Sequence, residues 1–166
     1  MIREENARDT AAIRDLLMQA FGSPAEADIV DALRLQCRDQ VSLVAERQGA
    51  VVGHILFTPV VIDTGHAPLQ GYGLAPVAVR PDAQRRGVGS TLVRAGIERV
   101  ARLGAPFIVV IGHPEYYPRF GFVRASAHGV RCQWDGVPDP AVMIHLLDPS
   151  VAARIGGVAR YRPEFG

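Results

Sequence analysis

The stretch that most constrains this chain is residues 76–100, PVAVRPDAQRRGVGSTLVRAGIERV. A short apolar run ends at an Arg-Pro pair, two arginines and two glycines follow, and apolar residues then recur at helical spacing. These residues predict a strand, a tight turn and a long helix. The first amides of a helix lack partners and carry partial positive charge, so glycines there let an anion approach. We expect a phosphate or pyrophosphate site; an ordinary turn with solvated arginines is the alternative.

Two common nucleotide-binding motifs do not fit this loop. A Rossmann fingerprint needs a third glycine where Leu92 stands, and its strand usually opens the domain instead of lying in the middle of the chain. A P-loop needs a lysine after its last glycine. All 18 Lys and Arg positions of this chain are arginine, which also excludes a lysine Schiff base.

The order of expected elements describes an α/β chain that forms a single domain over residues 1–166. Before the loop we expect the following: a strand at 2–4, helices at 8–21 and 24–37, a hairpin of 41–46 with 51–62 turning at Gln48-Gly49, and a strand at 71–79. After the long helix we expect these: a strand at 106–112, a short helix at most within 114–120, strands at 121–126 and 141–147, and a short helix and edge segment in the tail.

Composition narrows the function classes. A net charge of +1 implies no bulk attraction to nucleic acid or membrane, and 48% hydrophobic residues suffice for a core. Cys37 and Cys132 form no CxxC motif, the N-terminus is charged, and no run approaches the ~20 apolar residues of a membrane helix. We therefore expect a cytoplasmic protein. The five histidines lack metal-ligand spacing, so no metal is expected.

The segment QRRGVG, after VAVRPDA, resembles the coenzyme A loop of the GCN5-related N-acetyltransferases (GNAT), whose pattern is Gln/Arg-x-x-Gly-x-Gly/Ala. Further along, PFIVVIGHPEYYPRFGF is similar to the family's fifth strand and fourth helix, ending in Tyr-x-x-x-Gly-Phe. The resemblance is greatest to the bacterial YhbS-type predicted N-acetyltransferases and extends to about residue 147. It implies a mixed, mostly antiparallel sheet of about seven strands with about four helices, and a C-terminal extension. It also implies acetyl transfer from acetyl-CoA to a primary amine by direct attack in a ternary complex.

The resemblance further implies which residues hold acetyl-CoA. Val77, Ala78 and Val79 would offer backbone groups to the pantetheine arm, and the Val77 amide would polarise the thioester carbonyl. Pro76 suits a bulge that separates two strands to admit the cosubstrate. The amides from Arg85 onward would hold the pyrophosphate, in a loop that comprises Gln84, Arg85, Arg86, Gly87, Val88, Gly89 and Ser90.

Catalytic roles follow from the same resemblance. Tyr117, four residues before Gly121, occupies the position of the family's general acid and would protonate the departing thiolate; a phenol with pKa ~10 is protonated at neutral pH. The alternative is a core aromatic, with Tyr116 as the exposed tyrosine. His113 follows the strand at 106–112 and is our candidate base, because imidazole suits that role. Glu115 and a water chain are the alternatives, whereas His54 is expected to be a hydrogen-bonded strand histidine.

The acceptor stays open between a small molecule, a peptide N-terminus and a protein lysine. In this family residues 21–31 and 127–142 would line its pocket, where Trp134 stands. Acidic side chains there would attract a cationic amine or simply be solvated: Asp28, Asp31, Asp135 and Asp139. Two other functions stay open, namely a non-catalytic acyl-CoA-binding regulatory module and a transferase for another acyl-CoA. A homodimer is also open.

Overall fold

The computed structural model describes all 166 residues, and its internal contacts group them into two compact units. Unit 1 comprises Met1–Phe57, Pro76–Arg99 and Glu164–Gly166, and unit 2 comprises Thr58–Ala75 and Val100–Pro163. The single domain over residues 1–166 stays a prediction.

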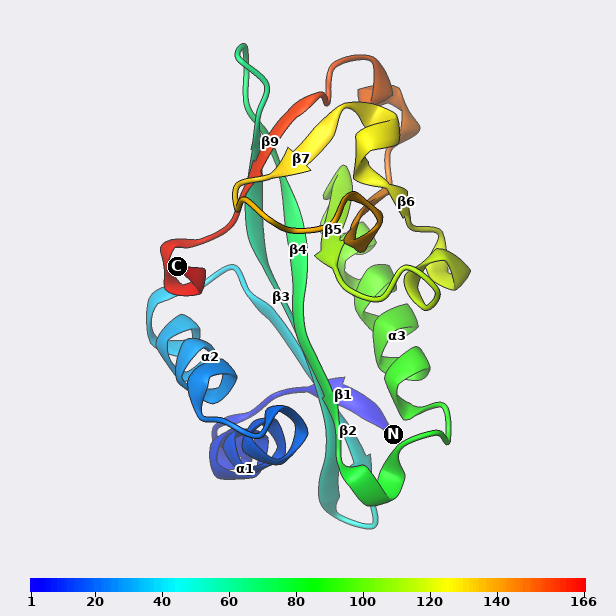
Figure 1. Cartoon of the computed structure of the whole chain (residues 1–166). Coiled ribbons are helices and arrows are strands. Elements are labelled where there is room, and N and C mark those ends of the chain that lie inside the picture. Colours follow the sequence, from blue (N-terminus) through cyan, green and yellow to red (C-terminus); the bar gives the residue numbers. More distant parts are fainter. The chain divides into compact units, whose positions relative to one another are not determined.

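The N-terminal half supplies the elements of unit 1 (Figure 1). They are β1 (Ile2–Glu4), a 3-10 turn (Ala7–Asp9), α1 (Thr10–Phe21), α2 (Ala25–Gln36), β2 (Val41–Arg47) and the first part of β3 (Ala50–Asp63). The β2–β3 hairpin turns at Gln48 and Gly49, whose φ angles are 51° and 77°, as the sequence predicts. Strand β1 pairs antiparallel with β2, and β2 pairs antiparallel with β3.

The alternating side chains of β3 pack against different helices on its two faces. Leu56 belongs to the buried apolar cluster formed with α1 and α2, which lie side by side (Figure 1). Gly53 faces α3 (Val88–Arg102) instead, and a Cβ there would lie 2.8 Å from Cδ1 of Leu92. A Cβ at Gly96 would collide with the ring of Phe57. Glycines on both the strand and the helix therefore allow α3 to approach β3 closely.

Unit 2 is built from short strands joined by 3-10 turns. The strands beyond β4 (Leu69–Val79) are β5 (Phe107–Ile111), β6 (Val123–Arg124), β7 (Val130–Cys132), β8 (Val142–Leu146) and β9 (Gly157–Arg160). Strand β5 pairs parallel with β4 and antiparallel with β8, and β9 pairs with both β3 and β7. Phe107, Val109 and Ile144 lie in one buried apolar cluster on one face of β5 and β8. Ile108 and Val110 are buried on the other face.

The predicted fold class is confirmed. The strands follow the order β1-β2-β3-β4-β5-β8-β6 in a mixed, mostly antiparallel sheet, to which β7 and β9 attach. There are nine strands and three α-helices, against about seven and about four expected. The expected fourth helix is only a 3-10 turn, Tyr117–Phe120, because it carries Pro118 and ends at Gly121 with φ 95°. None of the helices has both the length and the apolar character needed to cross a bilayer.

Candidate functional site

The glycine loop, residues 84–89, leads from the 3-10 turn Pro81–Ala83 to the start of α3. Arg85 and Gly87 have positive φ angles of 60° and 83°. This conformation is easy for glycine and costly for arginine. A Cβ at Gly87 would meet no atom within 4 Å, so the backbone conformation, not packing, requires glycine there. The loop thus leaves open space beside the first amides of a helix, where an anion can bind.

Hydrogen bonds hold both ends of the glycine loop. The side-chain amide of Gln84 donates to the carbonyl of Val79 at 3.0 Å. At the other end, the Thr91 hydroxyl donates to the carbonyl of Gly87 at 2.8 Å, alongside the Thr91 amide at 3.0 Å. The loop is therefore tied to the end of β4 and to the first turn of α3.

Exposed arginines give the glycine loop a positive surface. Arg85 and Arg86 are both exposed. A surface cavity of about 300 Å³ borders the loop and is lined by Arg86, Gly87 and Val88, together with Met1. Arg80, just before the loop, pairs with Asp82 at 2.6 Å, and this hydrogen bond lowers the pKa of Asp82. Arg85 and Arg86 therefore add two positive charges beside the helix start.

Strand β4 continues beyond its pairing with β5. The parallel register joins Tyr72 to Ile108 and ends at Leu74 with Val110, two residues before Pro76. The strand itself runs on to Val79 and so has a segment without a β5 partner in this register. An unpaired strand edge can accept an extended ligand by backbone hydrogen bonds.

Tyr117 stands in a cluster of aromatic rings in unit 2. It is 6% exposed, and burial raises its pKa to about 12. Its ring centroid lies 5.1 Å from that of Tyr116 and 5.8 Å from that of Phe122, both edge-on. A Cβ at Gly112 would collide with the Tyr117 ring. Tyr117 is therefore packed as a core aromatic and carries a protonated phenol, so its packing fits both interpretations that the sequence left open.

The candidate bases lie at the turn after β5. His113 is exposed, and its carbonyl accepts the amides of Tyr116 at 3.1 Å and Tyr117 at 3.4 Å. Glu115 is exposed too, and its carbonyl accepts the Arg119 guanidinium at 3.4 Å. These contacts fix the backbone beneath both side chains. They leave the choice between His113, Glu115 and water open.

The expected acceptor residues fall into two groups. Asp28 and Asp31 pair with Arg14 at 2.9 and 2.7 Å, and Asp31 also pairs with Arg34 at 2.7 Å, so both carboxylates already have cationic partners. In unit 2, Asp135 and Trp134 line a surface cavity of about 410 Å³. Asp28 and Asp31 on α2 are therefore not free to bind a cationic amine. Asp135, by contrast, is an exposed carboxylate.

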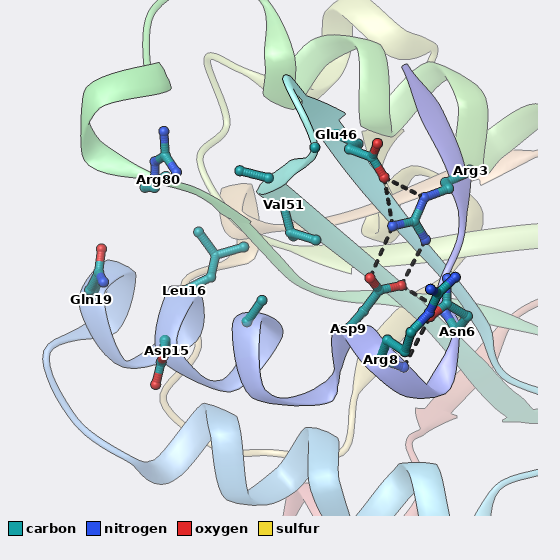
Figure 2. Close-up of a pocket in the computed structure, with 13 residues that line it drawn as sticks. Arg3, Asn6, Arg8, Asp9, Asp15, Leu16, Gln19, Glu46, Val51 and Arg80 are labelled. Carbon is teal, nitrogen blue, oxygen red and sulfur yellow. Dashed lines mark hydrogen bonds and ion pairs between the residues drawn. The ribbon is translucent and has the colours of Figure 1, made fainter.

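A larger cavity of about 560 Å³ was not anticipated from the sequence (Figure 2). It lies in unit 1 beside α1, the β2–β3 hairpin and Arg80. Figure 2 shows Arg3 between Asp9 and Glu46, with hydrogen bonds of 2.7 and 3.0 Å to the first and 2.8 Å to the second. One guanidinium against two carboxylates leaves this group of three negative, so it does not resemble an anion site. Pairing of β1 with β2 brings Arg3 close to Glu46, 43 positions away in the sequence, and local sequence patterns do not reveal such a contact.

A second polar cluster is buried around His54 in unit 1. His54 is fully buried, and its Nε2 lies 2.9 Å from Oγ of Ser42, which in turn donates to Glu5. Nε2 then carries the proton, and Nδ1 has no partner, so the expected hydrogen bonding is only half met. Because the carboxylate contacts the serine instead of the distal ring nitrogen, the cluster is not a nucleophilic triad. No group of three or more His, Cys, Asp or Glu side chains in the structure is arranged to hold a metal ion.

Sequence comparison places these features in a known family. Residues 1–125 match the family model described as acetyltransferase (GNAT) domain. The chain is 34% identical over 166 residues to the uncharacterized N-acetyltransferase YhbS of Escherichia coli (strain K12), covering 99% of this chain and 98% of that protein. It is 43% identical over 117 residues to the uncharacterized N-acetyltransferase YjhQ of the same strain, covering 69% of this chain and 64% of that protein.

Two solved structures share the whole architecture. E. coli YhbS in complex with CoA superposes with a TM-score of 0.92 at 34% identity, covering 99% of this chain and 91% of that one. A GNAT family acetyltransferase from Brucella melitensis in complex with acetyl-CoA gives a TM-score of 0.81 at 35% identity, covering 100% and 97%. Both similar structures contain CoA or its acetyl thioester.

Proposed function

The chain belongs to the GCN5-related N-acetyltransferase (GNAT) family, and we infer that this acetyl-CoA-dependent acyltransferase acetylates a primary amine by direct attack within a ternary complex. The observation that carries the proposal is the glycine loop. Its positive φ angles at Arg85 and Gly87, and the open space at Gly87, fit a diphosphate bound on backbone amides. Similar structures solved with CoA and acetyl-CoA support the same ligand.

Each part of acetyl-CoA then has a proposed partner in the chain. The amides from residue 85 to residue 90 hold the pyrophosphate, and Arg85 and Arg86 add charge. Gln84 contributes by holding the loop to Val79. Backbone groups of Val77, Ala78 and Val79 bind the pantetheine arm, because this part of β4 extends past its β5 register.

The reaction needs one acid, one base and one site for the oxyanion. The amine nitrogen attacks the thioester carbonyl, the Val77 amide stabilises the oxyanion, and the C–S bond then breaks. His113 or a water takes the proton from the amine nitrogen, and the Tyr117 phenol protonates the leaving thiolate. With a pKa raised to about 12, Tyr117 is protonated at every physiological pH. Proton transfer from this phenol to a thiolate of pKa ~8.5 is uphill by about 3.5 pKa units, and burial of the thiolate narrows that gap by raising the pKa of the thiol.

The acceptor amine is left unassigned among small molecules, peptide N-termini and protein lysines. Asp135 is the expected acid best placed to attract a cationic amine, because Asp28 and Asp31 are paired with Arg14 and Asp139 is paired with Arg124. A cytoplasmic location and a homodimer remain predictions.

Ligand-induced stabilisation tests the proposal. Acetyl-CoA at ~100 times its Kd should stabilise the folded protein by about 2.7 kcal/mol, which a thermal melt detects. Gly87→Glu should abolish that shift because its carboxylate occupies the anion position. Gly65→Glu is the matched control, since Gly65 has a similar φ of 79° and equally open surroundings. If wild type and the Gly65 variant show no shift either, the glycine loop is an ordinary turn.

The non-catalytic alternative has one observation in its favour, the near-complete burial of Tyr117. A binding module would show the thermal shift but release no thiol when acetyl-CoA is mixed with a panel of amines. Thiol release with any amine, lost in Tyr117→Phe while the thermal shift is kept, would establish the enzyme and support Tyr117 as its acid. Unchanged turnover in Tyr117→Phe would contradict that role.

A further inference from the structure

The Tyr117 ring is held on several sides by other parts of unit 2. Tyr116 and Phe122 contact it edge-on with interplanar angles of 80° and 74°, and Phe120 is 6.4 Å away. On a further side Gly112 leaves no room for even one methyl group. Any shift of Phe122 must therefore move Tyr117 or open a gap beside it, because packed rings have no free volume to absorb it.

Phe122 is in turn held by His145. The two ring centroids lie 5.5 Å apart at an interplanar angle of 70°, and Phe122 is 2% exposed. His145 stands on β8 opposite Ile108 of β5. Its neighbour Ile144 points into the buried apolar cluster of unit 2, so alternation places His145 on the other face of these strands, on the side of Phe122.

His145 also fills the space beside Gly121. A Cβ at Gly121 would lie 3.0 Å from Cε1, 3.1 Å from Nε2 and 3.4 Å from Nδ1 of the imidazole. Gly121 has φ 95° and closes the 3-10 turn that begins at Tyr117. One imidazole therefore contacts both the residue that ends this turn and the ring that packs on Tyr117.

The position of the His145 imidazole reduces the stability of the fold. Its Nδ1 is buried without a hydrogen-bond partner, and burial lowers the pKa of His145, so the ring is neutral. An unpaired buried nitrogen destabilises a protein, whereas a purely apolar side chain would avoid that loss. Packing of the apolar core alone does not explain why histidine occupies this position.

We propose that His145 is a positioning residue for Tyr117, which it holds in place through Phe122 and Gly121. It does not touch the reacting atoms. The proposal rests on the role of Tyr117 as general acid, since only then does the placement of the phenol affect turnover. A displacement on the order of 1 Å is enough to slow catalysis strongly when the group acts at a fixed position.

Kinetics give the first test, with His145→Ala, which removes the ring, and His145→Asn, which keeps a small planar group. His145→Ala should lower kcat about tenfold while the KM for acetyl-CoA stays within about twofold, and His145→Asn should lie between it and wild type. His66→Ala, in an exposed loop, is the matched control and should behave as wild type. A normal kcat in folded His145→Ala overturns the proposal.

A double-mutant cycle separates positioning from a general loss of stability. If His145 acts only through the Tyr117 hydroxyl, then Tyr117→Phe with His145→Ala should turn over within about twofold of Tyr117→Phe alone. Losses that multiply show that His145 acts by another route and overturn the proposal. Wild-type turnover in Tyr117→Phe is a different result, because it removes the acid role itself.

NMR of the tyrosines tests the positioning role of His145 without measuring turnover, so it distinguishes a failure of that role from a failure of the acid role of Tyr117. The chain has four tyrosines, so tyrosine labelled with carbon-13 at Cζ gives few NMR signals, and Tyr117→Phe identifies the one from Tyr117. In His145→Ala the Tyr117 signal should shift, and its pKa should fall from about 12 toward the usual ~10 as water reaches the phenol. An unchanged signal and titration would show that His145 does not hold Tyr117, whatever the role of Tyr117 in turnover.

Discussion

A Cβ atom added at Gly87 would meet no other atom within 4 Å, whereas one added at Gly112 would collide with the ring of Tyr117. Gly87 has a positive φ of 83° and Gly112 does not, so the first is needed for its backbone conformation and the second for space. The glycine loop keeps room outside the chain, where we propose that the diphosphate binds. The turn after β5 makes room inside the chain for one of its own aromatic rings. The same residue type therefore serves a proposed binding site in one region and the packing of a proposed catalytic group in the other.

Gly112→Ala should have the largest effect, and it should separate turnover from binding. The added methyl group displaces Tyr117, so we expect a loss of about 1–3 kcal/mol in the free energy of unfolding, as overpacking typically costs. The kcat should fall about tenfold or more, while the Kd for acetyl-CoA stays within about threefold. Chemical denaturation and steady-state kinetics measure both. Gly156→Ala is the control, since its Cβ would make only an ordinary contact at 3.6 Å.

Acid should weaken unit 1 through its buried histidine. Burial lowers the pKa of His54, so its imidazole stays neutral in the folded protein. In the unfolded chain the same imidazole takes up a proton below the usual histidine pKa of ~6.5. Stability should therefore fall as the pH drops from ~6.5, by up to about 1.4 kcal/mol per pH unit. Denaturation curves at pH 7.5 and 5.5 test this, with His54→Gln expected to flatten the dependence. If stability depends on pH equally in wild type and in His54→Gln, another group causes the dependence.

A separate loss is expected at lower pH from Glu5. Burial alone would raise the pKa of Glu5, but hydrogen bonds from Arg34 and Ser42, with His54 Nε2 a further 3.8 Å away, outweigh it and lower the pKa to about 2. This carboxylate stabilises the fold fully above its unfolded pKa of ~4.3, and the contribution disappears as the pH falls toward 2. The histidine and the glutamate therefore act in different pH windows.

Gly87→Ala should show the opposite pattern to Gly112→Ala. Forcing alanine into a positive φ costs about 1 kcal/mol of stability, and the methyl group enters the space proposed for the pyrophosphate. The Kd for acetyl-CoA should rise about tenfold while kcat at saturation changes little. Gly65→Ala carries the same backbone cost at φ 79° and should leave binding unchanged. If Gly87→Ala binds acetyl-CoA with the wild-type Kd, the open space at Gly87 does not serve binding of the pyrophosphate.

Local patterns predicted the glycine loop and the hairpin well, because both depend on neighbouring residues. Gln48-Gly49 and Gly87 adopt the positive φ angles that their turns require. Helix ends came within two residues for α1 and α2. The tail was expected to add an edge segment, but its strand β9 pairs with both β3 and β7 and so is not an edge.

Long-range contacts were beyond such patterns. Asp28 and Asp31 were expected either to attract a cationic amine or to be solvated, but Arg14 on the neighbouring helix pairs with both. The support of Tyr117 by His145 joins residues on different elements, and nothing near His145 in the sequence indicates it. Pairing and packing depend on how strands are ordered in the sheet, and a single chain's local composition does not encode that order.

Arg85→Gly should have the smallest effect. It tests how much the charge of the glycine loop, apart from its backbone shape, contributes to binding of acetyl-CoA. Arginine at φ 60° is strained, so glycine relieves the backbone but adds freedom to the unfolded chain, and stability should change by less than about 0.5 kcal/mol. The lost charge should raise the Kd for acetyl-CoA about threefold, with a weaker dependence of Kd on salt. Gln48→Gly, at the other non-glycine position with positive φ, makes the same backbone change away from the loop. Should both variants bind acetyl-CoA like wild type, Arg85 serves only the shape of the turn, and the backbone amides bind the diphosphate without its charge.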